Sequence, residues 1–321
     1  MIEVLTSAQL NTIQDAGRTH ALTLGVSIGG AMDGLALAAG NILVGNARNA
    51  AGIEVVFYPF RIRFEADTIC AVTGADCSAM LDGRAIPPWW AVRVRAGQVL
   101  ALSAPRSGCR AYVSVAGGLD VPDVLGARAT DMKGGFGGLG GHGLQRGNRI
   151  AVCPAARAGC ALPDDGIGVN PECALLPREG NVTVRFLPAA EYEEFLPRSR
   201  ERFMTENWTL SSSANRMGYR LEGAELGMRR PLSLFSHGIV PGTIQVPPSG
   251  QPIVQMLDAN TCGGYPKIGT VIEADLHLLA QLPIQGHVRF EEVRRDTAIA
   301  ALRRQHAMLD RLEQEVAAFY A

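Results

Sequence analysis

Short apolar runs that end at turn residues recur along most of the chain. In the first 150 residues these runs are rich in β-branched side chains and are broken by glycine or aspartate, and the same pattern returns after residue 180. Short runs of this kind are typical of strands. Many short strands with frequent turns are typical of barrels, so we predict a mainly β protein. The predicted strands lie in IEVLT, GIEVVF, DTICAVTGA, AVRVRAGQVLALS, CRAYVSVAGG, NVTVRFLPA, NWTLSSS, GTIQVPPSGQPIVQML, GTVIEADLHLLAQL and GHVRFEEV.

Three segments depart from this pattern and predict helices. Asp33 can cap a helix that begins directly after it and ends before Gly45. A short helix is expected from about Ala274 to Leu282. From Asp296 onward apolar residues recur at steps of three, four and seven, which predicts an amphipathic C-terminal helix. We expect this helix to pack on the second domain rather than to bind a partner.

A segment rich in alanine, proline and glycine separates the two β-rich regions. Residues 151–180 have no sustained apolar period, which is typical of a linker. We therefore predict an N-terminal β-barrel domain over residues 1–150 and a linker over 151–180. The C-terminal β-barrel domain then covers residues 181–321 and includes the C-terminal helix.

Composition excludes several classes of protein. The 321 residues are 47% hydrophobic and 19% charged, which suffices for a large core and excludes general disorder. A net charge of -1 gives no reason to expect nucleic-acid binding. No apolar run reaches the roughly 18 residues of a membrane span, and the first residues lack the layout of a secretory signal. We therefore expect a cytoplasmic protein. Seven cysteines without a C-x-x-C pair indicate reduced thiols rather than a disulfide framework or zinc site.

The first segment with candidate chemistry is TIQDAGRTHALTLGVSIGGAMD. It brings Gln14, Asp15, Arg18 and Asp33 close together in the sequence, among glycines that let a ligand approach the backbone. Arg18 could clamp an anion with two hydrogen bonds. The alternative is that the aspartate and arginine stabilise their own turn, and the sequence leaves both open.

The second segment is a glycine-rich loop, TDMKGGFGGLGGHGLQRGN. Seven glycines lie between Gly134 and Gly143, and successive backbone N–H groups in such a loop can bind a phosphate. The loop lacks the ending of a P-loop, so a tightly packed glycine loop is the alternative interpretation. Lys133 favours a phosphate site, because only two of the 30 basic residues are lysines and the others are arginines.

Two further segments concentrate polar residues. The segment SSSANRMGYRLEG places Asn215 and Arg216 at a glycine turn, which suits recognition of a phosphate or carboxylate. The alternative is that the arginine faces solvent. GTIQVPPSGQPIVQMLDANTCGGYPKIGTVIEADL is the densest, and its polar cluster is expected to form a site because unpaired buried polar groups are costly. Asp258 could hold Mg²⁺ or act as a base, and Lys267 could neutralise a phosphate. Cys262 has no identifiable histidine partner and is not predicted to be a nucleophile.

Nine segments, in the same order along the chain, resemble the biotin-dependent carboxyltransferase domain family. This family includes allophanate hydrolase subunit 2, KipA and the C subunit of bacterial 5-oxoprolinase. The resemblance runs from about Thr12 to Phe290. The segments are TIQDAGR, GGAMD, LVGN, AVTGA, RAYVSVAGGLDVP, TDMKGGFGG, NRMGYRLEG, IQVPPSGQPIVQMLD and TCGGYPKIGTVIEADL.

The resemblance implies a fold, a reaction and companions. The fold is two cyclophilin-like β-barrel domains with few short helices. In a bacterial chain of this size, the implied activity is that of the C subunit in an ATP-dependent 5-oxoprolinase, which opens 5-oxoproline to glutamate. The implied companions are a KipI-like protein and a LamB/YcsF-like protein, and ATP and Mg²⁺ would be shared with a companion. Opening a lactam with ATP requires that triphosphate and substrate bind side by side.

Two other functions stay open within the same family. One is the carboxyltransferase component of a biotin-dependent urea or amide carboxylase. Lys133 follows Met132 but precedes Gly134, so the chain lacks a Met-Lys-Met biotin acceptor and carries no covalent biotin. The other is a non-catalytic, KipA-like antagonist of a kinase inhibitor.

Three residues differ from the family pattern and leave the substrate open between 5-oxoproline, urea, allophanate and another amide. His142 stands where the family often has arginine. Ala259 and Cys262 stand where the family sequence DRQTTGGYP has arginine and threonine. We predict catalytic roles for Asp258, Asn215, Arg216, Thr261 and Lys267. Substrate or phosphate binding is predicted for Gln14, Asp15, Arg18, Asp33, Lys133, Gly134, Gly135, Gln245, Gly263, Gly264 and Tyr265.

Overall fold

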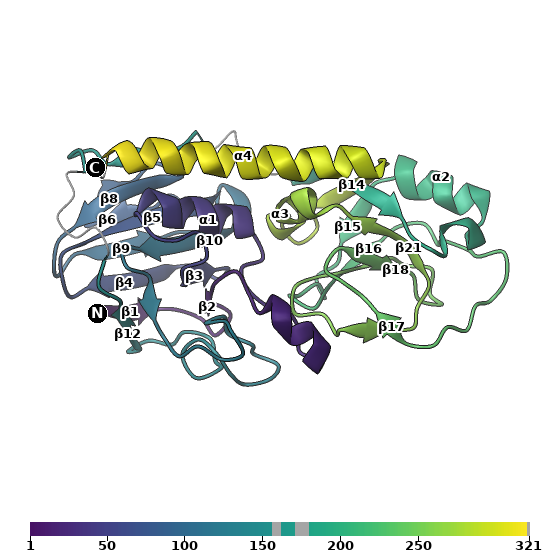
Figure 1. Ribbon diagram of the computed structural model, residues 1–321, viewed down its shortest axis with the longest axis horizontal. Coiled ribbons are helices and arrows are strands. Elements are labelled where there is room, and N and C mark those ends of the chain that lie inside the picture. Colours follow the sequence, from purple (N-terminus) through teal and green to yellow (C-terminus); the bar gives the residue numbers. More distant parts are fainter. Residues whose placement is uncertain (156–161, 171–179, 320–321) are drawn as a thin grey trace. The chain divides into compact units, whose positions relative to one another are not determined.

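The computed structural model describes residues 1–155, 162–170 and 180–319, and its contacts divide the chain into two compact units (Figure 1). Unit 1 comprises Met1–Arg18, Gly29–Leu176 and His306–Ala321, and unit 2 comprises Thr19–Ile28 and Pro177–Gln305. In the described ranges no helix combines the length and apolar character that crossing a bilayer requires.

This division differs from the predicted boundaries. Residues 19–28, which contain the 3₁₀ helix η1 (Thr19–Leu24), group with unit 2. Part of the predicted linker is sheet, because β12 (Arg149–Val152) and β13 (Ile167–Gly168) pair with strands of unit 1. The remaining parts of that linker, 156–161 and 171–179, lie outside the described residues. The lack of an apolar period in this segment therefore did not exclude strands. A strand of two residues, such as β13, is too short to show a period.

Unit 1 contains two sheets. In the seven-stranded sheet the order is β11 (Leu119–Asp120), β12, β1 (Ile2–Thr6), β4 (Phe60–Phe64), β9 (Val99–Leu102), β6 (Met80–Leu81) and β7 (Arg84–Ala85). In the six-stranded sheet the order is β13, β8 (Trp90–Val94), β5 (Thr68–Asp76), β10 (Ser107–Val115), β3 (Gly52–Val55) and β2 (Thr12–Gln14). Alternate residues of both sheets, such as Ile62 on β4 and Val113 on β10, form one apolar core.

Helix α1 (Gly34–Leu43) lies against the six-stranded sheet (Figure 1). Its N-cap is Asp33, as predicted, and the Asp33 side chain accepts a hydrogen bond from the Ala36 amide at 2.8 Å. The helix approaches the sheet closely at Gly40, where an added Cβ would lie 2.9 Å from the Thr73 hydroxyl oxygen. The Thr73 hydroxyl donates to the Ala36 carbonyl at 2.7 Å, so small and polar residues fix this contact.

Unit 2 is built on a closed seven-stranded barrel, which together with the sheets of unit 1 confirms the predicted mainly β fold. Around the barrel the order is β14 (Asn181–Pro188), β21 (Lys267–Val271), β18 (Thr243–Gln245), β19 (Ile253–Gln255), β16 (Gly218–Glu222), β15 (Trp208–Leu210) and β22 (His287–Glu292). Strands β14 and β22 are parallel and the other neighbours are antiparallel. Phe186, Phe203 and Phe290 pack together in its core, where Phe203 stacks on Phe290 at 4.3 Å between ring centroids.

Short elements complete unit 2. They are the 3₁₀ helices η3 (Tyr192–Glu194) and η4 (Glu273–Asp275), the helices α2 (Pro197–Thr205) and α3 (Leu276–Ala280), and the paired strands β17 (His237–Gly238) and β20 (Cys262–Gly263). Elements η4 and α3 together occupy the segment in which a short helix was predicted.

The C-terminal helix α4 (Arg295–Phe319) corrects one prediction. We expected it to pack on the second domain, but only its first part does so, where Ala301 contacts the cluster of Ile272 and Ala274 in unit 2. From His306 onward the helix belongs to unit 1. There Leu309, Leu312 and Val316 are buried in the same apolar cluster as α1. The spacing of apolar residues predicted the helix. This spacing does not show which unit the apolar face of the helix packs against.

Candidate functional site

One face of the six-stranded sheet of unit 1 carries a row of buried polar side chains. Thr12 on β2 lies opposite Glu54 on β3, and Glu54 lies opposite Tyr112 on β10. Neighbours along these strands, such as Ile13 and Ile53, belong to the apolar core on the other face. The three polar residues are at most 1% exposed. Because buried polar groups must be hydrogen-bonded, such a row concentrates specific interactions, and this face is a candidate site.

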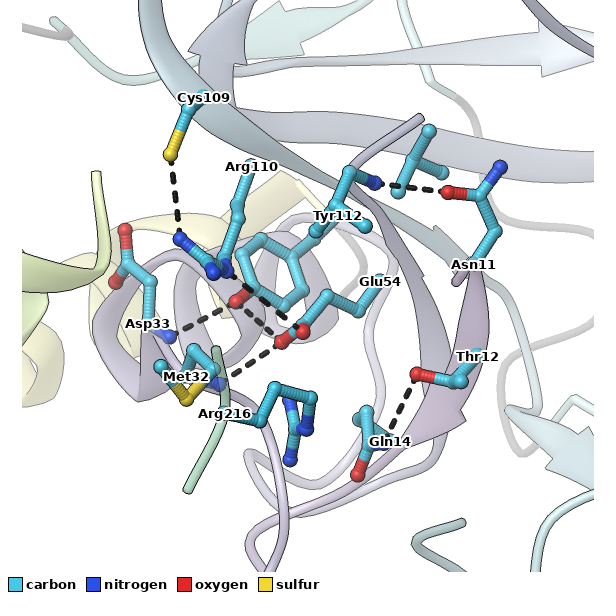
Figure 2. Close-up of polar contacts among 12 residues, drawn as sticks. Asn11, Thr12, Gln14, Met32, Asp33, Glu54, Cys109, Arg110, Tyr112 and Arg216 are labelled. Carbon is cyan, nitrogen blue, oxygen red and sulfur yellow. Dashed lines mark hydrogen bonds and ion pairs between the residues drawn. The ribbon is translucent and has the colours of Figure 1, made fainter. Parts of the chain in front are cut away.

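Glu54 is at the centre of a hydrogen-bond network (Figure 2). Its Oε2 accepts from the Tyr112 hydroxyl at 2.7 Å and from the Met32 amide at 2.8 Å. The Tyr112 oxygen accepts from the Asp33 amide at 2.8 Å, and Arg110 forms a 3.9 Å ion pair with Glu54. Burial, followed by the nearby Glu54 charge, raises the pKa of Tyr112 well above its ordinary value. Tyr112 therefore stays protonated and donates to the carboxylate.

Glu54, Arg110 and Tyr112 were not predicted from the sequence. They lie in the runs GIEVVF and CRAYVSVAGG, which we interpreted only as core strands. A single carboxylate inside an apolar strand is the signal that could have identified Glu54, because a charged residue is almost never fully buried without a partner.

Three predicted residues of unit 1 converge on one short segment of the chain. Asp15 accepts from the Arg128 amide at 2.5 Å through Oδ2. Arg18 donates from Nη2 to the Ala129 carbonyl at 2.5 Å. Gln14 donates from Nε2 to the Thr130 carbonyl at 3.3 Å and to the Thr12 hydroxyl at 2.9 Å. The structure thus brings Gln14, Asp15 and Arg18 together along residues 128–130.

Asp15 also closes its own turn, as the alternative interpretation of this segment proposed. Its Oδ1 accepts from the Gly17 amide at 2.8 Å. Both carboxylate oxygens therefore bind backbone amides, and Asp15 serves to fix the loop on which Arg18 stands. Arg18 does not share this purely local role, because its guanidinium binds residue 129 rather than Asp15.

Arg18 is buried to 1% exposure although it carries a full charge. The guanidinium lies over the Phe136 ring, 4.9 Å from the centroid, in a cation–π contact. Its Nε and Nη1 are buried and have no hydrogen-bond partner. A buried donor without a partner costs about 1–3 kcal/mol, and this cost applies to both groups.

The glycine-rich loop differs from the predicted phosphate cradle. The Gly134 amide donates to the Asp131 side chain at 2.7 Å, and the Gly135 amide donates to the Asp131 carbonyl at 2.9 Å. These two amides are occupied inside the loop, so their geometry does not support the predicted phosphate binding. Lys133 is exposed to solvent. The tightly packed interpretation fits better, since a Cβ on Gly137 would clash with the Ala129 carbonyl oxygen and lie 3.2 Å from Arg18 Nη2.

In unit 2, Arg216 and Asp258 form a bidentate ion pair. The distances are 2.8 Å from Nε to Oδ2 and 2.9 Å from Nη2 to Oδ1. The pair sits on a turn in which the Asn215 side chain accepts from the Met217 amide at 2.8 Å. We predicted that Asp258 would hold Mg²⁺ or act as a base. Each of its oxygens accepts one hydrogen bond from the guanidinium, so Arg216 holds the carboxylate in place. The predicted role of Asp258 as a metal ligand or base stays a prediction.

Lys267 is held by two side chains of unit 2. Its Nζ lies 3.1 Å from Glu191 Oε2 and contacts His237 Nε2. His237 Nδ1 lies 2.9 Å from the Phe235 carbonyl oxygen. Because a carbonyl only accepts, Nδ1 carries the proton and Nε2 faces the ammonium as an acceptor. Lys267 is therefore positioned by a carboxylate and an imidazole, and its predicted contact with a phosphate stays a prediction.

The remaining predicted residues of unit 2 gather around Gln245. Gln245 on β18 lies opposite Lys267 on β21, and its Oε1 accepts from Gln255 Nε2 at 3.0 Å. Gly263 allows this side chain to approach, since a Cβ there would lie 2.6 Å from Gln245 Nε2. Thr261 contributes its carbonyl to the Ile239 amide. The structure thus places Gln245, Gly263 and Lys267 together.

A pocket of about 490 Å³ lies in unit 2 and includes two predicted residues, Gly264 and Tyr265. Most of its other lining residues are apolar, among them Leu234, Val246 and Pro266. Tyr265 is 48% exposed, so its ring is available to a ligand or partner at the pocket edge.

The three residues that differ from the family pattern lie in different environments. Ala259 is buried to 8% exposure, whereas His142 and Cys262 are exposed. The cysteines of the described ranges are all free. Burial raises the pKa of Cys70 and of Cys77 to about 12, so these two thiols are unreactive at neutral pH. The described part of the chain contains no group of three histidine, cysteine, aspartate or glutamate residues that could hold a metal ion.

Comparison with known proteins gives two nearly full-length relatives. The C subunit of 5-oxoprolinase from Escherichia coli strain K12 is 41% identical over 312 residues, which cover 97% of this chain and 97% of the relative. The C subunit of 5-oxoprolinase from Haemophilus influenzae is 39% identical, covering 98% of this chain and 99% of the relative.

A solved structure and a family model agree with this relationship. The crystal structure of Kluyveromyces lactis urea carboxylase superposes with a TM-score of 0.87 at 25% identity over 98% of this chain. This chain spans only 29% of that much longer protein. The model described as carboxyltransferase domain, subdomain A and B, matches residues 24–292. The chain therefore belongs to the carboxyltransferase domain family.

Proposed function

We propose that this chain is the C subunit of a 5-oxoprolinase, the enzyme that opens 5-oxoproline to glutamate. The observation that carries the proposal is the 41% identity to the corresponding protein of Escherichia coli along 97% of both chains. A match of this extent spans both units rather than a single shared motif.

The chemistry explains why the chain needs buried polar clusters. A lactam resists water because its carbonyl is a poor electrophile. ATP supplies a phosphoryl group that converts the lactam oxygen into a leaving group. Water then adds to the carbonyl carbon, and the ring C–N bond breaks as the nitrogen takes a proton, which leaves an acyl phosphate. A second water hydrolyses this acyl phosphate to glutamate and inorganic phosphate. The part of this chain is to bind and orient the small substrate, for which the convergent side chains of unit 1 are suited.

ATP and Mg²⁺ are assigned to the complex rather than to carboxylates of this chain. Asp33 caps α1, and both oxygens of Asp258 accept hydrogen bonds from Arg216. Lys267 is suited to a phosphate in charge and is held in place by Glu191. We propose that the companions supply the metal ligands.

The proposed companions are a KipI-like protein and a LamB/YcsF-like protein, in the cytoplasm. Both relatives are named as the C subunit of their enzyme, which supports an assembly of several chains. We do not propose nucleic acid or a membrane as a partner, in keeping with a net charge of -1.

The test is an assay of the purified complex. The chain is co-expressed with its KipI-like and LamB/YcsF-like companions, and ADP and glutamate are measured after addition of 5-oxoproline, ATP and Mg²⁺. We expect equal amounts of ADP and glutamate. An intact complex that releases no glutamate would contradict the proposal.

Carboxyl transfer is the second candidate, favoured by the TM-score of 0.87 to a urea carboxylase. Since this chain carries no biotin acceptor sequence, carboxybiotin would arrive on another protein. A streptavidin blot of the complex and a bicarbonate-dependent ATPase assay with urea separate the two candidates. A biotinylated companion together with urea-dependent ADP formation would favour carboxyl transfer.

A further inference from the structure

A hollow on the barrel of unit 2 contains none of the residues predicted to form a site. Its volume is about 440 Å³, which lies in the range of small-molecule pockets. The lining residues are Asn181, Val182, Thr183, Asn207, His287 and Arg289. Valine is the one apolar residue among them and none of them is acidic, so this hollow suits a polar ligand, unlike the apolar pocket beside Tyr265.

Strands β14 and β22 place four of the polar side chains next to one another. The two strands are parallel, and Asn181 lies opposite His287. Two residues further on, Thr183 lies opposite Arg289. Residues two apart on a strand share a face, and these four are exposed, whereas Val288 between His287 and Arg289 is buried. The four side chains therefore stand on the outer face of the barrel.

Strand β15 forms the other side of the hollow. It pairs antiparallel with β22, and Thr209 lies opposite His287. Asn207 directly precedes β15, and the same register brings it beside Arg289. The Arg289 guanidinium thus has the hydroxyl of Thr183 on one neighbouring strand and a side-chain amide on the other.

Arg289 carries a charge that no described residue neutralises. In the ranges 1–155, 162–170 and 180–319 its guanidinium forms neither an ion pair nor a hydrogen bond. The next residue on the same strand face, Glu291, lies opposite Arg185 on β14. A guanidinium with free donors binds an oxyanion with two parallel hydrogen bonds, so Arg289 makes the hollow an anion site.

The imidazole of His287 has one nitrogen engaged and one available. The Thr209 hydroxyl oxygen lies 3.2 Å from Nδ1, and this contact holds the ring. Nε2 has no hydrogen-bond partner in the part of the chain that the structure describes. An imidazole nitrogen and a side-chain amide both form hydrogen bonds with hydroxyl groups. The row of Asn181 and His287 therefore suits the hydroxyl groups of a ligand.

We propose that this hollow binds a small phosphate monoester that bears hydroxyl groups. Arg289 binds the phosphate, and Thr183 and Asn207 donate to it from the two neighbouring strands. A phosphate has three terminal oxygens that can accept from these three directions, whereas a carboxylate has only two oxygens in one plane. Asn181 and His287 bind the hydroxyl groups of the organic part.

The binding test is calorimetry on the purified full-length chain at fixed ionic strength. The probes are ribose 5-phosphate, ribose, which lacks the phosphate, inorganic phosphate, which lacks the hydroxyl-bearing part, and acetate, which offers a carboxylate. We expect ribose 5-phosphate to bind about tenfold more tightly than inorganic phosphate or acetate, and ribose not to bind. Affinity for acetate or inorganic phosphate equal to that for ribose 5-phosphate, or no binding of ribose 5-phosphate at millimolar concentration, would overturn the proposal.

Substitutions show whether the probe occupies this hollow. We expect Arg289→Met to weaken ribose 5-phosphate binding about tenfold or more, and Thr183→Val about threefold. Both side chains are exposed, so the thermal midpoint should stay close to that of the unaltered chain. Arg220→Met is the matched control, because Arg220 is an exposed arginine on β16 of the same barrel and does not line the hollow.

The control separates a site from general charge attraction. Binding that is unchanged in Arg220→Met and lost in Arg289→Met would support the proposal. Equal losses in the two variants, or no loss in Arg289→Met, would overturn it. The test involves no turnover of 5-oxoproline, so failure of the proposed function leaves its result unaffected.

Discussion

Gly137 is one of the residues through which the glycine-rich loop packs against its neighbours. Gly137 and Gly135 both have positive φ, +73° and +70°, but a Cβ would meet the Ala129 carbonyl only at Gly137. Gly137→Ala should therefore lower the free energy of unfolding by more than about 2 kcal/mol, through backbone strain and the clash. Gly135→Ala, with nothing within 4 Å, should cost only the strain of about 1 kcal/mol. Urea unfolding of the two variants checks this. Equal losses would refute the packed-loop interpretation.

Arg18 shows how a single residue can be identified by its sequence and yet require the structure for its role. The segment TIQDAGR suggested either an anion clamp or a turn stabilised by its own side chains. In the structure the turn interpretation holds for Asp15 but not for Arg18. Asp15 makes the turn, through the Gly17 and Arg128 amides, whereas Arg18 leaves Nε and Nη1 unsatisfied. Sequence could name both residues but could not assign the roles, because the Arg128–Thr130 segment that orients their neighbourhood lies 111 to 116 positions further along the chain.

Glu54 and Asp258 show what sequence could not supply at this scale. Glu54 was missed since its strand is otherwise apolar, and its partners Tyr112 and Met32 come from other elements. Asp258 was recognised, but its engagement by Arg216 depends on a turn 42 residues earlier. The type of a residue predicts the chemistry that its side chain can perform. Its hydrogen-bonding partners, which only the structure shows, determine how the side chain is held.

At the scale of elements, the apolar runs predicted most strands, because strands such as β3 and β5 bury consecutive residues. Strand β4 was missed although its residues alternate between buried and exposed, and α2 was missed because arginines outnumber its apolar residues. Helix α1 was predicted from its cap, and the cap is present at Asp33. Local signals thus sufficed for the capped helix and for the long apolar runs, but not for an alternating strand such as β4.

Helix α1 also provides a test at its contact with the sheet. Alanine is normally better than glycine in a helix by about 1 kcal/mol. At Gly40, however, a Cβ would lie 2.8 Å from the Ser114 hydroxyl oxygen. Gly40→Ala should therefore lower the stability by about 1–2 kcal/mol, because overpacking outweighs propensity. Gly34→Ala, in the same helix with no atom within 4 Å, should be neutral or stabilising. Thermal unfolding measures both, and a stabilised Gly40→Ala would show that the helix does not press on the sheet.

At the scale of the whole molecule, helix α4 takes part in both units. Its first turns contact Ile272 and Ala274, while Leu309 is buried with α1. Arg48 adds an ion pair to Asp310 at 2.8 Å, but Asp310 is 59% exposed and such pairs contribute at most about 1 kcal/mol. Apolar burial is therefore the main attachment of the last turns.

This attachment predicts where a core mutation in α4 acts. Leu309→Ala should lower the stability by about 2–4 kcal/mol and increase amide hydrogen exchange in α1. Ile299→Ala, at a position 38% exposed in the same helix, should change the stability by less than about 0.5 kcal/mol. Exchange mass spectrometry reports the location. If exchange rose in the barrel strands of unit 2 while α1 stayed protected, the assignment of the last turns to unit 1 would be wrong.

The most direct test of the proposed function is to withhold this chain from its own complex and then add it back. Glutamate released from 5-oxoproline is followed with ATP present throughout. We predict that release stops without the chain and returns in proportion to the amount added. Release at full rate in the absence of the chain would contradict the proposed function.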